Sequence, residues 1–257
     1  MEKSILHLDW GKIAYWAGGQ GENLLLLHSL NLSAEAWGKV TEPLSRSYRI
    51  YAWDMPGHGD SDKPPKNYLV EDYARDVVGF MDRLSIDSAI VCGNSVGALI
   101  ALELAASSPR RVAKLILVGC PVRDPWERLE RLTLASLTFD VEGNPRPFSL
   151  ADLTVTFPHP TPDLLQWFNR QRGRAGLWVK KTLIAVTLYE VIPKLTQVKC
   201  PTLVLFGEQD IFRDRDKLLL QKIKGARSAI IQDGGHVPQV DKPQEFLREV
   251  SRFLSGP

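Results

Sequence analysis

The sequence predicts an α/β protein with a mostly parallel central sheet of about eight strands, helices on both faces and a helical insertion. Three observations lead to this fold class. Six short runs of Leu, Ile and Val recur along the chain and end in turn residues, which is typical of strands buried on both faces of a parallel sheet. Helical periodicity separates most of these runs. Residues 123–193 contain helical patterns without a strand pattern.

The two amino-terminal segments differ from the other strands because their apolar and polar residues alternate. Segments 4–9 and 12–19 therefore predict an antiparallel hairpin at the edge of the sheet, with its turn at Asp9-Trp10-Gly11. The buried strands are expected to follow at 23–29, 48–54, 88–93, 114–119, 202–207 and 228–233.

Two helices of the expected core are identified by their apolar patterns. In segment 71–84 the apolar residues recur at three- and four-residue spacing and form one stripe. Segment 96–106 has Glu103 as its single charge, so this helix is expected to be buried nearly all round and to end near Pro109. The stripe of the first helix consists of Tyr73, Val77, Phe80, Met81 and Leu84.

Strand and helix patterns stop alternating between Val122 and Pro193. This stretch contains three helical patterns, and the middle one follows a Thr161-Pro162-Asp163 capping sequence. We therefore expect residues 1–122 and 194–257 to form the core, and residues 123–193 to form a helical cap over the carboxyl ends of the strands. The three helical patterns span 124–137, 164–172 and 176–190.

The composition indicates a soluble, cytoplasmic protein. With 257 residues, 44% of them hydrophobic, the chain is long enough for one large domain with an insertion. A net charge of +2 argues against nucleic acid and anionic membranes as partners, because both require a concentrated basic face. No signal-peptide pattern or membrane span occurs, and Cys92, Cys120 and Cys200 are expected to be reduced thiols. Nothing in the sequence predicts an oligomeric state.

The segment Gly93-Asn94-Ser95-Val96-Gly97 lies where a buried strand is expected to end and a buried helix to begin. This is the context of a nucleophile elbow, which holds a serine hydroxyl at the carboxyl edge of a sheet. Glycines are needed on both sides because a Cβ atom there would clash with neighbouring backbone. The free N–H groups and the dipole of the helix amino terminus favour a developing oxyanion. Ser95 is therefore the candidate nucleophile, and a simple helix cap is the alternative role.

A serine nucleophile requires a base, and the base requires a group that orients it. In this type of fold the partners follow in the order serine, acid, histidine, each after a later strand. Asp210 and His236 come directly after the last two predicted strands and are the candidate acid and base. The alternative acids are Asp124, Asp214 and Asp216.

Together with two further motifs, these residues resemble the α/β-hydrolase superfamily, in its branch of capped serine esterases and lactonases. Segment 24–30 (LLLLHSL) is similar to the oxyanion loop of this family. Segment 54–64 (DMPGHGDSDKP) matches its Asp-x-Pro-Gly-His-Gly-x-Ser-Asp turn, which is highly specific. The match extends over almost the whole chain, and it implies the α/β-hydrolase fold with a cap above the site.

The resemblance also implies the oxyanion donors, which are the backbone N–H groups of Leu30 and Val96. The family's usual histidine–glycine pair reads His28-Ser29 here, so the shape of this loop is expected to differ while its backbone donors persist. For His28 and His58 the resemblance implies a structural role, in which both residues hold loops in place.

The implied function is a serine hydrolase that cleaves a small carboxylic ester or lactone through an acyl-enzyme on Ser95. This chemistry requires no metal or organic cofactor, and the sequence has no metal-ligand spacing. A carbon–carbon bond hydrolase of a vinylogous diketone would share the three residues, but members of that branch commonly carry a tryptophan where this chain has Val237. A slow-turnover receptor for a small lactone and a perhydrolase are further alternatives.

The second half of the expected cap combines basic and aromatic side chains. One interpretation is a pocket for an anionic, partly apolar small-molecule substrate, with Trp167, Arg170 and Trp178 as candidate contacts. The alternative is a basic helix face turned to solvent, because acidic residues dominate the first half of the insertion. The basic residues are Arg170, Arg172, Arg174, Lys180 and Lys181.

Overall fold

The computed structural model describes residues 1–256, apart from the side chains of residues 131, 134 and 135. Its eight strands form one sheet in the order β1-β2-β4-β3-β5-β6-β7-β8. The pairs β1–β2 and β2–β4 are antiparallel and the other neighbours are parallel, so the mostly parallel sheet that the sequence predicts is confirmed. The strands are β1 (Glu2–Leu8), β2 (Gly11–Gly18), β3 (Glu22–Leu27), β4 (Tyr48–Trp53), β5 (Ala89–Asn94), β6 (Val112–Val118), β7 (Thr202–Gly207) and β8 (Arg227–Ile231).

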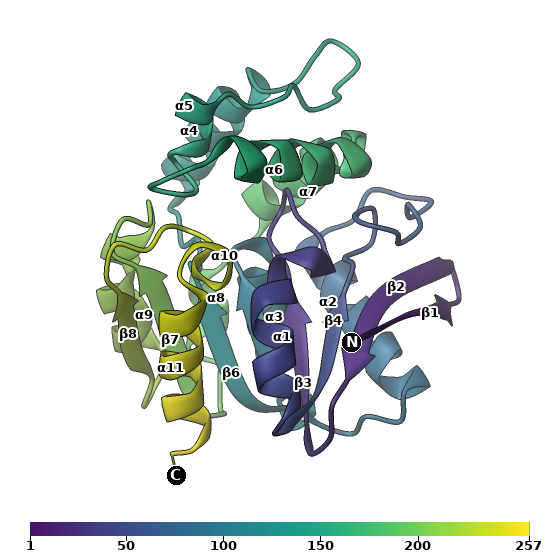
Figure 1. Ribbon diagram of the computed structural model, residues 1–257, viewed down its shortest axis with the longest axis vertical. Coiled ribbons are helices and arrows are strands. Elements are labelled where there is room, and N and C mark those ends of the chain that lie inside the picture. The colour runs from purple at the N-terminus through teal and green to yellow at the C-terminus, as the bar shows by residue number, and fades with distance from the viewer. Residues whose placement is uncertain (257) are drawn as a thin grey trace.

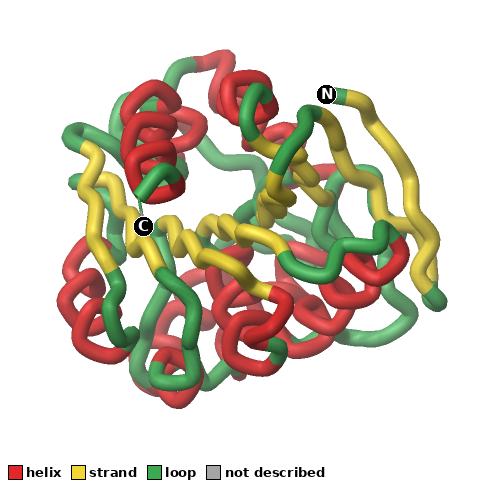
Figure 2. Tube along the Cα trace, turned by 90° about the horizontal axis from the view of Figure 1, so that it is seen from below, coloured by secondary structure: helices red, strands yellow, loops and turns green. Residues whose placement is uncertain are grey.

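Helices cover both faces of the sheet, as the view from one end shows (Figure 2). The helices outside the segment between β6 and β7 are η1 (Ala34–Trp37), α1 (Gly38–Ser45), α2 (Val70–Arg83), α3 (Val96–Ser107), η2 (Pro109–Arg111), η3 (Arg213–Arg215), α9 (Asp216–Lys222), α10 (Pro238–Asp241) and α11 (Pro243–Leu254). Alternate side chains of a strand point to opposite faces. On β3, Leu25 and Leu27 therefore contribute to the core with α2 and α3, whereas Leu24 and Leu26 contribute to the core with α1 and α11.

Helix α3 is buried at every position from Val96 to Ala105, as its nearly uncharged sequence predicts. Its one charge, Glu103, accepts a hydrogen bond of 2.8 Å from the Tyr189 hydroxyl and lies 2.8 Å from the Lys194 ammonium. A buried carboxylate requires such partners because its desolvation is costly. Burial and the neighbouring Glu103 raise the pKa of Tyr189, so its hydroxyl stays a donor. These bonds attach the end of the predicted insertion and the residue that follows it to the helix that follows Ser95.

The chain between β6 and β7 forms the helical segment that lies over one end of the sheet (Figure 1). Three of its helices correspond to the predicted patterns, and the longest begins where the Thr161 side chain accepts a hydrogen bond from the Leu164 N–H. The division into a core and a separate cap stays a prediction. The helices are α4 (Pro125–Ser136), α5 (Leu150–Leu153), α6 (Pro162–Ala175), α7 (Leu177–Leu188) and α8 (Ile192–Leu195).

Over residues 1–256, no helix combines the length and the apolar character that are needed to cross a lipid bilayer.

Candidate active site

Ser95 lies on a strained turn between β5 and α3. Its backbone has φ 56° and ψ −113°, a left-handed conformation that a residue other than glycine adopts only when its surroundings enforce it. The two flanking glycines allow the turn. A Cβ atom on Gly93 would lie 2.1 Å from the Gly97 carbonyl oxygen, and one on Gly97 would lie 2.1 Å from the Leu27 carbonyl oxygen. The turn therefore has the geometry that a nucleophile elbow requires.

Asp210 and His236 are joined by their side chains. The Nδ1 atom of His236 lies 3.0 Å from both carboxylate oxygens of Asp210, whose side chain is fully buried. The Phe212 N–H also donates to Asp210 Oδ1 at 2.9 Å, so the carboxylate has a fixed orientation. A carboxylate at Nδ1 favours the tautomer with its proton on Nδ1, which leaves Nε2 as a proton acceptor.

The alternative acids have other partners. Asp124 accepts a hydrogen bond from the Glu127 N–H at the start of α4. Asp216 pairs with Arg213, and Asp214 pairs with Arg215. Of the four acids that the sequence offered, Asp210 is the one that contacts the ring of His236.

The predicted nucleophile, the predicted base and the two predicted oxyanion residues line one small cavity, which we call the Ser95 cavity. Its volume is about 90 Å³. Ser95, His236, Leu30 and Val96 all contribute to its wall, although they come from three separate places in the sequence. Val96 is the first residue of α3, and the first N–H groups of a helix have no carbonyl partner within that helix. The cavity therefore combines a hydroxyl, an imidazole and a helix amino terminus.

Two residues at this site gave no functional signal in the sequence. Gly119 has φ 54°, and a Cβ atom there would lie 2.8 Å from both Asp210 Oδ2 and His236 Nδ1. Asn94 is fully buried and its Nδ2 donates to the carbonyl oxygens of His236 at 2.9 Å and Val118 at 3.2 Å. The one hint of a role for Gly119 was its position at the end of a predicted strand. Asn94 occupies a variable position of the Gly-x-Ser-x-Gly motif, so the motif itself assigns no role to this residue.

The backbone of His236 is held from two sides. Its carbonyl accepts the bond from Asn94, and its N–H donates to the Thr156 carbonyl at 2.9 Å. Thr156 belongs to the helical segment between β6 and β7, and Asn94 belongs to the turn that carries Ser95. The position of the imidazole therefore depends on contacts with both parts of the chain.

We expect the variant Asn94→Asp to lower kcat for ester hydrolysis by roughly tenfold or more, with little change in KM. An oxygen would replace Nδ2 and would face two carbonyl oxygens, so His236 would shift while the cavity wall keeps its other residues. Initial-rate kinetics on a p-nitrophenyl ester measures both constants.

The matched control is Gln239→Met. Gln239 Nε2 donates to Asn94 Oδ1 at 3.2 Å, while its buried Oε1 has no hydrogen-bond partner among the residues described. This variant leaves the bond to His236 in place, so kcat should change by only a few-fold. Equal losses of kcat in both variants would argue against a role of Asn94 in positioning His236.

His28 and His58 lie beneath the site, fully buried, with their rings 5.6 Å apart. The Nε2 atom of His28 accepts a hydrogen bond of 2.8 Å from the Met55 N–H, and its Nδ1 donates to the Ser29 carbonyl at 2.8 Å. Burial and the neighbouring His58 lower the pKa of His28 to about 3, and burial lowers the pKa of His58 to about 4. Both imidazoles are therefore neutral, and His28 joins two loops of the core, in agreement with a structural role.

This burial predicts that the two buried imidazoles lower the stability of the protein in acid. The pKa of His28 is 6.5 in the unfolded chain and about 3 in the native chain, so the unfolded state binds more protons between these values. Each buried imidazole should lower the free energy of unfolding as the pH falls below about 6.5, by at most about 1.4 kcal/mol per pH unit. Urea unfolding between about pH 7 and pH 4.5 measures this slope.

The variant His28→Gln is the control for this prediction. It should be less stable than the wild type at neutral pH, and its stability should depend less on pH because one imidazole is absent. Asp76 and Asp241, whose pKa values burial raises to about 6, act in the opposite direction between about pH 4 and pH 6 in both proteins. An unchanged slope in the variant would contradict the assignment to His28.

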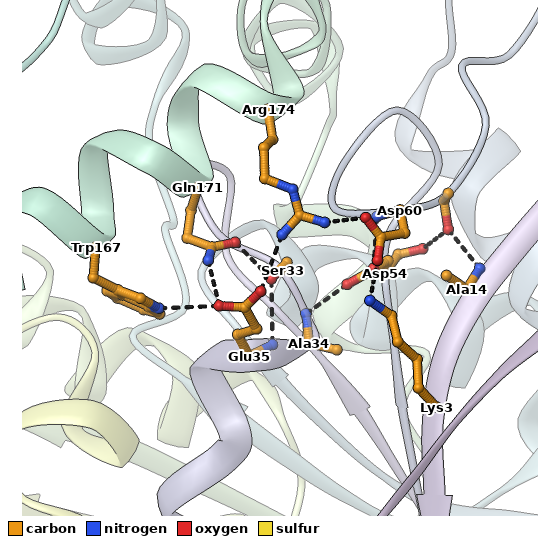
Figure 3. A network of polar contacts seen from close by, with 11 residues as sticks. Lys3, Ala14, Ser33, Ala34, Glu35, Asp54, Asp60, Trp167, Gln171 and Arg174 are labelled. Carbon is orange, nitrogen blue, oxygen red and sulfur yellow. Dashed lines mark hydrogen bonds and ion pairs between the residues drawn. The ribbon is translucent and has the colours of Figure 1, made fainter.

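The residues proposed from the sequence as substrate contacts do not line the Ser95 cavity. The Trp167 indole donates to Glu35 Oε2 at 3.3 Å, in a network that also includes Gln171 and Arg174 (Figure 3). Trp178 is buried beneath Gly57, where a Cβ atom would lie 2.5 Å from the indole. Arg170 is exposed on α6. These positions therefore give no support to a substrate-binding role for the three residues.

The network in Figure 3 instead attaches α6 to the core. Glu35 on η1 accepts hydrogen bonds from Trp167, Gln171 and Arg174, which are spaced along one face of α6. Arg174 also pairs with Asp60, in the loop after β4. Helix residues three or four positions apart lie on the same face. The Glu35 carboxylate therefore binds three side chains from one face of α6 and attaches that face to η1.

No group of three or more His, Cys, Asp or Glu side chains within residues 1–256 is arranged to hold a metal ion. Cys92 and Cys120 are buried free thiols, and burial raises the pKa values of both. Such thiols are protonated and unreactive. The described site brings together a hydroxyl, an imidazole and a carboxylate.

Comparison with known proteins places the chain in a family. Residues 24–249 match the alpha/beta hydrolase family. A 2-hydroxy-6-oxo-6-phenylhexa-2,4-dienoate hydrolase of Comamonas testosteroni is 30% identical, over 94% of this chain and 91% of its own. A pimeloyl-[acyl-carrier protein] methyl ester esterase of Nitrosospira multiformis is 26% identical, over 91% of this chain and 95% of its own.

Solved structures give the same assignment. A bacterial membrane phospholipase A is similar with a TM-score of 0.85 and 27% identity, over 99% of this chain and 86% of its own. An N-acyl homoserine lactone degrading enzyme is similar with a TM-score of 0.77 and 25% identity, over 97% of this chain and all of its own. The chain therefore belongs to the alpha/beta hydrolase family and is a hydrolytic enzyme of that family.

Proposed function

We propose that the protein is a serine hydrolase that cleaves a small carboxylic ester or lactone through an acyl-enzyme on Ser95. One observation carries the proposal. The Asp210 carboxylate lies 3.0 Å from Nδ1 of His236, in a site where Ser95 and His236 line the same cavity. An imidazole oriented in this way can accept the proton of a serine hydroxyl in the same cavity, which supports the proposal.

In the first step, Nε2 of His236 accepts the Ser95 proton while Oγ forms a bond to the carbonyl carbon of the substrate. Asp210 stabilises the imidazolium that results. The imidazolium then protonates the leaving alkoxide as the carbon–oxygen bond breaks. In the second step a water molecule gives its proton to His236 and attacks the acyl-enzyme, which releases the acid and restores the hydroxyl.

The backbone N–H groups of Leu30 and Val96 are the proposed oxyanion donors. Both residues line the Ser95 cavity, and Val96 lies at the amino terminus of α3, where the helix dipole also favours negative charge. In comparable sites each donor contributes about 3–4 kcal/mol to transition-state stabilisation. Backbone donors do not depend on the side chain at residue 29, so the serine there is compatible with this role.

The segment 123–193 is proposed to act as a cap that restricts access to Ser95. Its residues Val155, Thr156 and Phe168 form part of the wall of the Ser95 cavity, so a substrate must pass them. The proposed reaction uses protein groups and water alone, and it requires no metal or organic cofactor. The proposed partner is the small-molecule substrate, and neither nucleic acid nor a membrane is needed.

A carbon–carbon bond hydrolase is the second candidate, because the relative of 30% identity is named as one. The same three residues would serve that reaction. Val237 follows the histidine here, and this buried valine offers no indole to contact an extended conjugated substrate.

Steady-state assays on three substrate classes separate the candidates. We expect turnover of p-nitrophenyl esters or of small lactones, and slower turnover of 2-hydroxy-6-oxo-6-phenylhexa-2,4-dienoate. Faster turnover of the dienoate would favour the second candidate. A burst of product without further turnover on any substrate would indicate a receptor and would contradict the proposal.

A further inference from the structure

A second cavity, of about 380 Å³, adjoins the Ser95 cavity. Several residues line both cavities, so a bound molecule that extends from one cavity into the other would contact these shared side chains. The second cavity has the size of a small-molecule binding pocket, which is roughly 300–1,000 Å³. The residues that line both are Leu30, Asn31, Val155, Thr156 and Leu183.

The wall of the second cavity combines aromatic rings with a buried arginine. The Arg172 guanidinium lies 4.6 Å from the centre of the Phe148 ring and 5.3 Å from that of Phe139. It donates hydrogen bonds to the side chain of Asn31 and to the carbonyl of Thr138. These contacts hold the guanidinium in place, and an arginine keeps its charge in a protein. The cavity therefore has a fixed positive charge in its wall.

A second arginine, Arg146, lines the same cavity with an exposed side chain. Its backbone is fixed, because its N–H donates to the Thr138 carbonyl at 2.8 Å and its carbonyl accepts a bond from Arg172 Nε at 3.3 Å. None of the ion pairs between described residues involves its guanidinium. Arg146 is thus positioned at the cavity, and its charge is accessible to a ligand.

The charges of the two cavities are unbalanced. Three arginines and one acidic residue line them within the part of the chain that the structure describes. The acid, Asp152, accepts hydrogen bonds from the N–H and the hydroxyl of Ser149 at the start of α5, so its oxygens already have hydrogen-bond donors. Three cationic side chains and one anionic side chain leave an excess of positive charge among the residues that line the two cavities. A recessed wall with an excess of one sign of charge attracts ligands of the opposite sign.

We propose that the second cavity binds a chain of the substrate that ends in a carboxylate, and that Arg146 is a residue that selects it. This inference rests on the proposed hydrolase function and names the substrate class. The apolar and aromatic wall would contact the methylene groups, while the carboxylate would lie near Arg146 and Arg172. A chain without the carboxylate would lose the charged contact and keep the apolar one.

Matched pairs of methyl esters test the proposal. Monomethyl adipate is compared with methyl hexanoate, and monomethyl suberate with methyl octanoate, by titration of the acid released. A third pair, 6-acetoxyhexanoate and hexyl acetate, forms a second series that places the carboxylate on the alcohol side of the ester. We expect kcat/KM to favour the charged member in at least one series by roughly tenfold, and rising salt to reduce this preference. The series that responds identifies the side of the ester that occupies the second cavity.

The variant Arg146→Gln should reduce the preference for the charged ester several-fold, because kcat/KM for the charged ester should fall more than kcat/KM for the uncharged ester. The control is Arg110→Gln, which removes the same charge from an exposed position in η2, next to the amino end of β6. This control should keep the full preference. Loss of the preference in both variants would indicate a long-range charge effect and would overturn the role of Arg146.

The outcome also separates this inference from the proposed function. Equal turnover of charged and uncharged esters in every series would overturn the second cavity as a carboxylate site, although the hydrolase function would stand. Failure to cleave any of these esters, together with failure on p-nitrophenyl esters and lactones, would overturn the proposed function itself.

Discussion

The variant Ser95→Ala is expected to lose ester hydrolysis by roughly 10⁴- to 10⁶-fold in kcat/KM, because the nucleophile is absent and the remaining site can only bind and polarise the substrate. The fold should persist. Alanine keeps the Cβ atom of serine, so the strained backbone at φ 56° is no more strained than before. We expect the free energy of unfolding to change by less than about 1 kcal/mol. Rates on a p-nitrophenyl ester and urea unfolding measure the two quantities.

The matched control for this prediction is Ser107→Ala. It removes the same hydroxyl from the opposite end of α3, where Ser107 Oγ donates to the Glu103 carbonyl at 2.8 Å. This variant should retain wild-type activity. If Ser95→Ala kept more than a few per cent of the rate, the assignment of the nucleophile would fail.

The variant Asp210→Asn is expected to lower kcat by roughly 10⁴-fold. The amide has nearly the same shape as the carboxylate, but its NH₂ group would donate to Nδ1 of His236 and would favour the tautomer with the proton on Nε2. An imidazole in that tautomer cannot accept the Ser95 proton. The negative charge that stabilises the imidazolium would also be absent. Rapid-mixing kinetics on an activated ester shows whether acylation of the enzyme is the step that slows.

Asp216→Asn is the control, because Asp216 follows the same strand and pairs with Arg213. Its activity should stay within a few-fold of the wild type, and this activity is the quantity that decides the test. A large loss in Asp216→Asn, with near-normal activity in Asp210→Asn, would show that a different acid orients His236.

The core of the fold and the three candidate catalytic residues were predictable because their signals are local. Buried parallel strands are continuous apolar runs, and all six such runs correspond to strands of the sheet. The elbow is marked by glycines that the turn requires. Asp210 and His236 follow strands whose carboxyl ends meet at one edge of the sheet, so strand order alone was enough to bring them together.

The residues of the insertion that line the two cavities were not predictable for a physical reason. Helix α7 has apolar residues on all sides, so its periodicity does not indicate which face meets a cavity and which meets the core. The orientation of α6 is fixed by Glu35, a residue far away in the sequence. Trp167 therefore faces the core, whereas Arg172, five positions later, lines a cavity.

Asn94 and Gly119 were missed for a different reason. The contact of Asn94 with the His236 carbonyl joins residues 142 positions apart, and no periodic pattern encodes such a bond. Gly119 resembles any glycine at the end of a strand until Asp210 and His236 are placed against it.

The central claim is that Ser95 forms the covalent intermediate, and active-site labelling tests it most directly. Diethyl p-nitrophenyl phosphate should transfer its diethylphosphoryl group to Ser95 Oγ and release p-nitrophenolate, with loss of activity in proportion to labelling. Tandem mass spectrometry of the digested protein should locate one such group per chain on Ser95, and His236→Ala should label far more slowly. Inactivation with the label on another residue, or undiminished labelling of Ser95→Ala, would contradict the account.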